Sequence, residues 1–267
     1  MKLGDDLLVI SIRIGLNNML DSLAEPNVAI TFSLVLALGI IATVKRFLDT
    51  SGIFAAGIIG IIVGIGGHWT WLAILLIFLV TGSFATRWSY EEKDAMGLAE
   101  AREGARNWTN VFANGGAPAL VSMIAWFSSD SIIWAAPFLA AVAVASADTL
   151  ASEFGVLDPR VRMIISGKHV AAGTNGGTSP TGQLAAAGGS LLITFLGCIL
   201  FTTFSVGFDA DIVRVFCVVS LMGWTGCQID SILGALFENR GLMTKGQVNL
   251  ISIAFGAGAT FFLLGLV

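Results

Sequence analysis

Residues 147–182 read ADTLASEFGVLDPRVRMIISGKHVAAGTNGGTSPTG, and this polar stretch interrupts a chain that is otherwise strongly apolar. Asp148 and Glu153 close a long apolar run, and Lys168 follows a short basic segment. The stretch continues with glycines through which a backbone can approach phosphate oxygens closely, in the segment Gly173-Thr174-Asn175-Gly176-Gly177. Carboxylates for a metal and amides for phosphates point to nucleotide chemistry, so we expect any active site to lie here.

The rest of the chain has the composition of an integral membrane protein. Hydrophobic residues make up 55% of the 267 residues and charged residues only 12%, whereas an ordinary soluble domain is about 25% charged. Spans of about 20 residues joined by short loops leave no room for a separate soluble domain. We therefore predict an all-α fold in which residues 1–267 form a single integral membrane domain, a polytopic bundle of transmembrane helices.

Eight apolar runs set the expected number of spans at about eight. They cover residues 27–44, 52–67, 69–86, 108–127, 132–150, 184–204, 212–234 and 248–267, with residues 1–25 as a doubtful extra helix. Those first residues lack a basic region followed by a cleavage site, so we expect neither a signal nor a transit peptide. In the second run, small residues recur at every fourth position, which predicts close packing of helix backbones; they are Gly52, Ala56, Gly60 and Gly64.

Basic residues concentrate in alternate loops. Eleven of the 14 lysines and arginines lie in four connections, at Lys45, Arg46, Arg87, Lys93, Arg102, Arg106, Arg160, Arg162, Lys168, Arg240 and Lys245. By the positive-inside rule these four loops are cytoplasmic and both termini are outside. We therefore expect a multi-pass protein of the cell membrane with an active site that faces the cytoplasm.

Three carboxylates near the ends of apolar runs have a neighbouring hydroxyl: Asp49-Thr50, Asp148-Thr149 and Asp230-Ser231. Ionisable groups at membrane depth are costly, so they usually face a cavity, form a pair or bind an ion. Mg²⁺ takes one or two carboxylates and completes its shell with water and phosphate oxygens, which suits Asp148 and Asp230. A structural ion pair is the alternative for each carboxylate, although the apolar runs offer few basic partners. Helix capping explains Asp49 equally well.

The entry to the fourth apolar run is unusually polar. Arg106-Asn107-Trp108 is followed by Asn110 and then by Asn114-Gly115-Gly116. Arg106 can clamp a phosphate in a bidentate manner, and a cytoplasmic anchor at the membrane edge is an equally good interpretation. The preceding loop, residues 87–107, mixes both signs of charge and predicts a solvated amphipathic helix.

No soluble nucleotide-binding signature is present. The chain has no G-x-x-x-x-G-K-[ST] sequence, and we do not expect Gly176-Gly177 to lie in a strand-turn-helix context. No nucleophile is paired with a base either. The residues favour phosphoryl or nucleotidyl transfer, in which positioning and charge neutralisation supply most of the catalysis.

Five groups of residues follow one another along the chain: Lys45-Arg46 with Asp49 to Gly52, Arg106-Asn107-Trp108 with Asn114-Gly115-Gly116, Asp148 to Glu153, Gly167-Lys168 with Gly173 to Gly177, and Asp230-Ser231 to Ala235. This ordered set resembles the family of the plant phytyl-phosphate kinase, over nearly the whole chain. A looser similarity connects it to dolichol kinase and to the phosphatidate cytidylyltransferases, which also use CTP.

The resemblance implies a polytopic membrane kinase that uses CTP or another nucleoside triphosphate. Its acceptor would be a prenyl monophosphate, such as phytyl or geranylgeranyl phosphate, which it would convert to the diphosphate. It also implies Mg²⁺ near Asp148 and Asp230, with Glu153 as a further ligand or an orienting group. Lys168 and the amides of residues 173–177 would hold the nucleotide phosphates, and Arg106 would hold the acceptor phosphate.

Further phosphate-binding candidates come from the same motifs: Lys45, Arg46, Asp49, Asn107, Asn114 and Ser179. The prenyl tail would lie in a groove between spans that is open to lipid. The chain departs from the family pattern at residues 178–180, where a branched apolar residue is more usual than Thr-Ser-Pro.

Two other functions remain open. A cytidylyltransferase that forms a CDP-lipid needs the same CTP, Mg²⁺ and lipid phosphate. An ion-coupled transporter or lipid translocator would use the carboxylates as an ion site, although transporters place such residues near the bilayer midplane on broken helices. The expected partners are the nucleotide, the lipid phosphate and the membrane, with no nucleic acid, and the sequence allows a homo-oligomer.

Overall fold

The long helices of the protein coincide with the eight apolar runs of the sequence. The computed structural model describes residues 25–99, 105–128, 130, 132–204, 206–208 and 211–265. Within them the long helices are α2 (Pro26–Lys45), α3 (Thr50–Gly66), α4 (Trp69–Arg87), α6 (Trp108–Phe127), α7 (Ala135–Gly155), α8 (Pro180–Thr203), α9 (Ile212–Leu236) and α10 (Lys245–Leu264). The predicted all-α bundle is confirmed, while the doubtful helix at the N-terminus lies outside the described residues.

Six of the described helical segments are long and apolar enough to cross a membrane. They comprise α2, α4, α7 with the turn before it, α8, α9 with the turn after it, and α10. α3 is apolar but has only 17 residues, and α6 has 20 residues but carries two asparagines in its first two turns. The expected count of about eight therefore corresponds to six candidate spans, one shorter apolar helix and the more polar α6.

Shorter elements join the long helices. They are α5 (Tyr90–Ala95), η2 (Ile132–Trp134), η3 (Glu238–Arg240) and an antiparallel pair of strands, β1 (Arg162–Met163) and β2 (Gly177–Thr178). Segment 87–107, which was expected to be an amphipathic helix, contains only the six-residue α5 in its described part. Its residues 100–104 lie outside the described residues. Lys93 within α5 is buried rather than solvated, because it has a carboxylate partner in the bundle.

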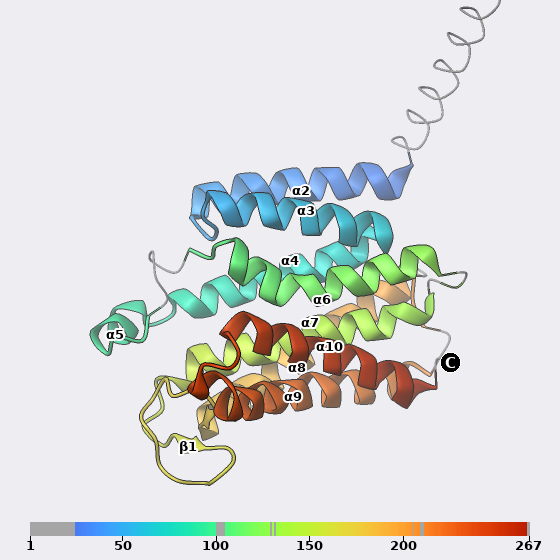
Figure 1. Ribbon diagram of the computed structural model, residues 1–267. Coiled ribbons are helices and arrows are strands. Elements are labelled where there is room, and N and C mark those ends of the chain that lie inside the picture. Colours follow the sequence, from blue (N-terminus) through green and yellow to red (C-terminus); the bar gives the residue numbers. More distant parts are fainter. Residues whose placement is uncertain are drawn as a thin grey trace, which may run out of the picture.

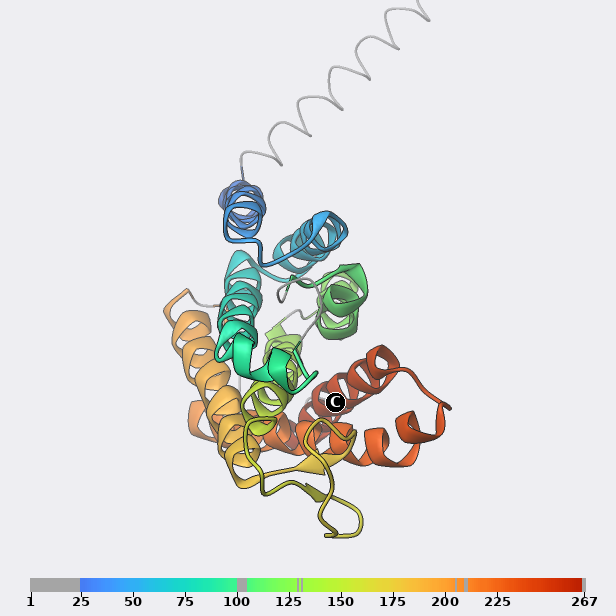
Figure 2. The same ribbon diagram turned by 90° about the vertical axis from the view of Figure 1, so that its left-hand side faces the viewer.

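α7 is the central helix. It packs against α4, α6, α8, α9 and α10, and Figure 2 shows these helices around it. Residues 135–147 of α7 are all buried. Facing glycines allow the close approach, since a Cβ at Gly226 of α9 would collide with Val144 and one at Gly197 of α8 with Leu139. This packing brings Asp148, near the end of α7, against several neighbouring helices.

The small-residue stripe of α3 packs as predicted. Gly52, Ala56, Gly60 and Gly64 are buried, and α3 lies against α2 and α6. A side chain at Gly64 would collide with Thr31 of α2. Small residues here therefore serve the close approach of helix backbones.

All four basic connections lie at one end of the bundle. Successive long helices run in opposite directions, so α5 and the loop that carries β1 extend from the same end, on the left in Figure 1. The C-terminal end of α10 lies at the other. We call the end with connections 45–50, 87–108, 155–180 and 236–245 the loop end. The side of the membrane that it faces stays a prediction from the basic residues.

Candidate active site

Two polar cavities lie between the helices at the loop end. The first, of about 260 Å³, is lined by residues 173–179 together with Asp148 and Asp230, and we call it the glycine-loop cavity. The second, of about 400 Å³, is lined by Arg106, Asn114 and Asn249 among others, and we call it the arginine cavity. Both cavities share four lining residues, Asp148, Ser152, Glu153 and Lys245. The two chambers therefore meet at Asp148.

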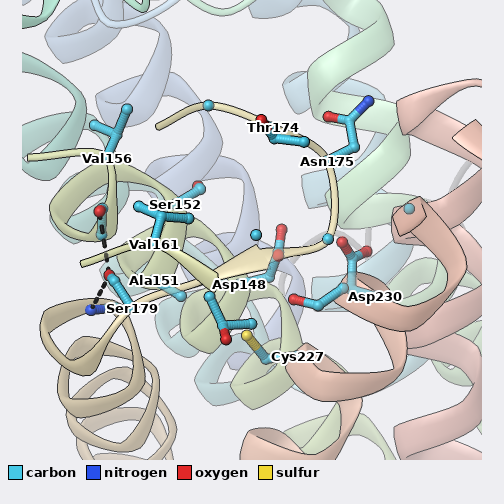
Figure 3. Close-up of a pocket in the computed structure, with 18 of the residues that line it drawn as sticks. Asp148, Ala151, Ser152, Val156, Val161, Thr174, Asn175, Ser179, Cys227 and Asp230 are labelled. Carbon is cyan, nitrogen blue, oxygen red and sulfur yellow. Dashed lines mark hydrogen bonds between the residues drawn. The ribbon is translucent and has the colours of Figure 1, made fainter. Parts of the chain in front are cut away.

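Asp148 and Asp230 face the glycine-loop cavity from neighbouring helices (Figure 3). Each lies about two turns from the loop end of its helix, α7 or α9. The two carboxylates are close enough to interact directly, and both interact with Lys245, the first residue of α10. Ser252 Oγ, also on α10, donates a hydrogen bond to Asp230 Oδ2 at 2.9 Å. Two carboxylates and one ammonium from three helices thus converge at the junction of the cavities.

The donor chemistry of this carboxylate pair fits Mg²⁺, which takes one or two carboxylates and keeps several waters. Ser231 lines the cavity beside Asp230 and adds a hydroxyl. No group of three or more His, Cys, Asp or Glu side chains is placed to hold a metal within the described residues. A magnesium ion held by Asp148 and Asp230 would therefore rely on water and phosphate oxygens for its other ligands.

Glu153 is held in a buried ion pair. Its Oε2 lies 2.7 Å from Lys93 Nζ, and its Oε1 accepts a hydrogen bond from Thr86 Oγ1 at 2.8 Å. Because α7 stays helical to Gly155, Glu153 does not share the helix face of Asp148, although it still lines both cavities. In the structure Glu153 thus forms an ion pair, which is the alternative that the sequence disfavoured. Its partner Lys93 comes from α5, in a loop, and not from one of the apolar runs.

The glycine-rich segment folds against α9. Gly173 and Gly176 both have a φ of +79°, a conformation that favours glycine. A Cβ at Gly176 would collide with Ala235 and the carbonyl of Ser231. The backbone N–H groups of Asn175 and Gly176 have no hydrogen-bond partner in the described part of the chain. Both residues line the cavity (Asn175 is labelled in Figure 3), so these amides are available to an anion.

Two polar anchors hold the loop that carries this segment. The buried Asp158 carboxylate accepts hydrogen bonds from the Arg160 side chain at 2.9 and 3.0 Å, and from the Thr181 N–H and hydroxyl at 3.1 and 2.7 Å. Hydrogen bonds from Arg160 and Thr181 hold the pKa of Asp158 well below its usual range. Ser179 is the N-cap of α8, and its hydroxyl donates to the carbonyl of Gly155 at 3.2 Å. Ser179 therefore lines the cavity and also fixes the end of the loop.

Lys168 lies away from both cavities. It is exposed in the turn after β1, where Gly167 adopts a φ of +67°. Its carbonyl accepts a hydrogen bond from the N–H of Met163 at 2.8 Å, and it is not a lining residue of either chamber. The described conformation therefore does not bring Lys168 to the carboxylate pair.

The backbone of Arg106 is seated on the start of α3. Its N–H donates to the carbonyl of Phe47, and its own carbonyl accepts from the N–H of Asp49, both at 3.1 Å. A Cβ at Gly52 would collide with that carbonyl. Asp49 is the N-cap of α3 and accepts a hydrogen bond from the N–H of Gly52 at 2.8 Å. The segment from Asp49 to Gly52 thus positions Arg106, which confirms the capping interpretation of Asp49.

The side chain of Arg106 reaches the arginine cavity. Its guanidinium lies 3.4 Å from Thr86 Oγ1, the hydroxyl that also contacts Glu153. On the same wall, Asn114 Oδ1 and Asn249 Oδ1 are buried and have no hydrogen-bond partner among the described residues. Buried polar atoms normally have partners, so these two oxygens indicate that the chamber holds a polar ligand or ordered water.

Three of the remaining candidates line neither polar cavity. Asn107 is the N-cap of α6 and accepts from the N–H of Asn110 at 3.1 Å. Lys45 and Arg46 end α2, and their carbonyls accept hydrogen bonds from the guanidinium of Arg87 at 2.6 and 2.5 Å. These residues fix helix ends near the site in this conformation.

Comparison with known proteins places this chain in a family. Residues 33–257, a range that includes the lining residues of both cavities, match the family described as integral membrane protein DUF92. The chain belongs to this family. It is an integral, multi-pass membrane protein.

Relatives of this DUF92 protein come from archaea and plants. An uncharacterized membrane protein, MJ0933, of Methanocaldococcus jannaschii is 31% identical over 229 residues, which cover 85% of this chain and 90% of that protein. Protein PGR of Arabidopsis thaliana is 32% identical over 217 residues, 74% of each chain. Protein VTE6, chloroplastic, of the same plant is 26% identical over 226 residues, 79% of this chain and 63% of that protein. No solved structure matches the chain.

Two lysines of this DUF92 protein, Lys93 and Lys245, were predicted from sequence only as basic loop residues. Lys245 was counted only as a basic loop residue, yet it lines both cavities. One signal was available, because a cation in the first turn of a helix opposes the helix dipole and is unfavourable without an anionic partner. Lys93 gave no comparable signal, since its segment alternates charges in the manner of a solvated surface.

Proposed function

We propose that this DUF92 protein is a transferase that moves the γ-phosphoryl group of CTP, or of another nucleoside triphosphate, to a prenyl monophosphate. The observation that carries the proposal is the pair of polar cavities with a common wall. One contains two backbone amides that have no partner among the described residues, beside two carboxylates. The other contains an arginine beside buried oxygens that lack a partner within the same residues. Two phosphate-bearing substrates, one in each chamber, would meet at Asp148.

The glycine-loop cavity suits the nucleotide. The free amides of Asn175 and Gly176 would bind its phosphates, as in other anion-binding backbone loops. Mg²⁺ held by Asp148 and Asp230 would supply neutralisation of the phosphate charge. Lys245 lies at the junction of both chambers and would stabilise the charge that shifts between donor and acceptor during transfer.

The arginine cavity suits the acceptor phosphate. Arg106 presents a guanidinium that binds phosphate oxygens in a bidentate manner, and its backbone is fixed on α3. The likeness of the five motifs to the phytyl-phosphate kinase family supports phytyl or geranylgeranyl phosphate as the acceptor class. In the proposed reaction an oxygen of the acceptor phosphate attacks the γ-phosphorus, the bond from that phosphorus to the bridging oxygen breaks, and CDP leaves.

A cytidylyltransferase is the alternative that the site chemistry also accommodates. There the acceptor oxygen attacks the α-phosphorus and pyrophosphate leaves, so the lipid retains cytidine. A transporter is less well supported, because α7, α9 and α10 run unbroken past the carboxylates, whereas transporter ion sites typically lie on discontinuous helices.

The test is to incubate the purified protein with geranylgeranyl phosphate and CTP labelled either at the γ-phosphate or in the cytidine. We expect the γ-label in lipid and CDP in solution, and no transfer with the Asp148→Asn variant. Cytidine label in lipid with release of pyrophosphate would replace the kinase with the cytidylyltransferase. Absence of both labels from lipid, over a panel of prenyl and acyl lipid phosphates, would reject a transferase. Accessibility of the loop end to impermeant reagents tests the proposed cytoplasmic orientation separately.

A further inference from the structure

The connection between α7 and α8 carries a projecting tip that the proposed reaction does not use. The tip consists of β1 and the turn after it, residues 162–169, and we call it the basic tip. Residues 165–169 are all exposed, and a Cβ at Gly167 would meet no atom within 4 Å. No residue of the tip lines either polar cavity. The transfer chemistry therefore assigns no role to this segment or to Lys168 within it.

Hydrogen bonds hold the basic tip in a defined shape. The N–H of Met163 donates to the carbonyl of Lys168, and the N–H of Gly167 donates back to the carbonyl of Met163, both at 2.8 Å. The N–H of Ile164 donates to the carbonyl of Gly176 at 2.9 Å, which joins the tip to the glycine-rich segment. The tip therefore keeps a fixed place relative to the bundle.

The basic tip extends sideways over the lipid that surrounds the bundle. In both views the loop that carries β1 reaches past the side of the long helices (Figures 1 and 2). β2, the partner of β1, ends at Thr178, two residues before α8 begins at Pro180. Leu184 of α8 is 76% exposed, so the apolar surface that faces lipid begins about 6 Å along that helix, at 1.5 Å per residue. The base of the paired strands is therefore close to the membrane surface.

The exposed charges of this loop are all positive. Residues 156–178 contain one acidic residue, Asp158, which is buried and bound by the Arg160 side chain. The exposed basic residues of the loop are Arg160, Arg162 and Lys168. Ile165 lies between the last two on the tip and is 52% exposed. An apolar side chain flanked by cations matches the surface of an anionic membrane, where the apolar part is buried and basic side chains reach the phosphates.

We propose that the basic tip docks on anionic phospholipid headgroups of the membrane around the protein, with Ile165 below the headgroups and Arg162 and Lys168 at the phosphates. This inference goes beyond the proposed function and does not depend on it. An acidic soluble protein would match the charges alone. The sideways position of the tip over lipid and the exposed isoleucine favour the membrane.

The first test attaches the environment-sensitive fluorophore NBD at Ile165→Cys, in the full chain without its three native cysteines. The protein is placed in nanodiscs of phosphatidylcholine alone, or of equal parts phosphatidylcholine and phosphatidylglycerol. We expect emission at shorter wavelength in the anionic discs than in the neutral ones. The difference should be lost in about 1 M salt, where the Debye length is about 3 Å. Equal emission in both lipids would overturn the proposal.

Two charge reversals separate the basic tip from the general charge of the loop end. Lys168→Glu and Arg240→Glu each reverse one exposed basic residue at that end, but Arg240 lies in the connection between α9 and α10. We expect Lys168→Glu to abolish the shift in emission and Arg240→Glu to retain it. Loss of the shift in both variants, or in neither, contradicts docking by the tip. A shift that CTP produces in detergent, without anionic lipid, would place the tip on the nucleotide and also overturn the proposal.

The second test needs no label and uses the native side chains in the same nanodiscs. Trypsin cleaves after exposed lysine and arginine, so cleavage after Lys168 reports access to the tip, and cleavage after Arg240 is the internal control. We expect the ratio of the two rates to fall about tenfold or more from neutral to anionic discs, the scale that two basic residues near an anionic surface provide. An unchanged ratio rejects docking on lipid. Protection by an added acidic protein, and not by lipid, would assign the tip to a soluble partner instead.

Discussion

Replacement of Lys93 by methionine isolates the contribution of the buried ion pair between α5 and α7. The Lys93 side chain is 1% exposed and donates to Glu153 Oε2 at 2.7 Å and to the carbonyls of Ala85 and Thr86 at 3.1 and 2.9 Å. Methionine keeps the length of the side chain but removes all three donors. Breaking a buried pair from one side costs about 3–5 kcal/mol. For a chain of this size about 1 kcal/mol shifts Tm by about 2–4 °C, so we expect Lys93→Met to lower Tm by about 6–20 °C.

The assay is thermal unfolding of the purified protein in detergent, followed by circular dichroism. Lys168→Met is the matched control, because Lys168 is exposed and has no side-chain partner in the described part of the chain. In the double variant with Glu153→Gln, the loss should be smaller than the sum of the single losses, since both changes remove one interaction. The reasoning fails if Lys93→Met shifts Tm no more than Lys168→Met. If Glu153→Gln abolishes transfer at saturating Mg²⁺ and leaves Tm unchanged, Glu153 acts as a metal ligand and not as a structural ion-pair partner.

Asp148→Asn and Asp230→Asn should each abolish transfer and leave the protein folded, because removal of charge relieves desolvation; near-normal turnover at saturating Mg²⁺ would exclude both as metal ligands. Lys245→Ala should lower kcat about 10²-fold, the scale of one lost charge-stabilising donor, whereas Lys168→Ala should change kcat little. A large fall for Lys168→Ala with little change for Lys245→Ala would show that Lys168, and not Lys245, acts on the substrate. Asp158→Asn should make Tm less dependent on pH in the acid range. The folded-state pKa of Asp158 is depressed, so its stabilisation is present above the ordinary aspartate pKa of about 3.9 and is lost as the pH falls below it; superimposable Tm profiles of the two proteins would contradict this. A cysteine at Lys168, in a background without the native three, should be shielded from an impermeant thiol reagent in intact cells, and labelling from outside would reverse the predicted orientation.

Several parts of the site follow from sequence because they are local. The segment from Gly173 to Gly177 was expected to let the backbone approach phosphate oxygens closely. Gly173 and Gly176 have positive φ angles, and two of its amides have no partner among the described residues; phosphate binding stays a prediction. For Asp49 the sequence left a helix cap and a role in the site equally open, and the structure shows a helix cap. Each of these features depends on residues within one or two turns of each other, where sequence spacing fixes the geometry.

Other parts required the packed helices. Glu153 and Lys93 are 60 residues apart, and their pairing depends on where α5 folds back onto α7. Lys168 lies close in sequence to the glycine-rich segment, but the turn after β1 directs it away from the cavities. From sequence Lys245 is an ordinary basic loop residue. In the structure it begins α10 and lies beside two carboxylates.

By itself the sequence determined the apolar helices, their order and the gathering of basic loops at one end, because hydropathy and charge are summed over neighbouring residues and each helix satisfies its own backbone hydrogen bonds in a membrane. Only the tertiary structure decided which polar side chains meet. The rotation and approach of α7, α9 and α10 are set by contacts of small residues such as Gly226 against Val144, and a shift of one residue around a helix moves a side chain by about 100°. The carboxylate pair, its lysine and the two joined cavities are therefore properties of the packing, to which the sequence contributes the residues but not their convergence.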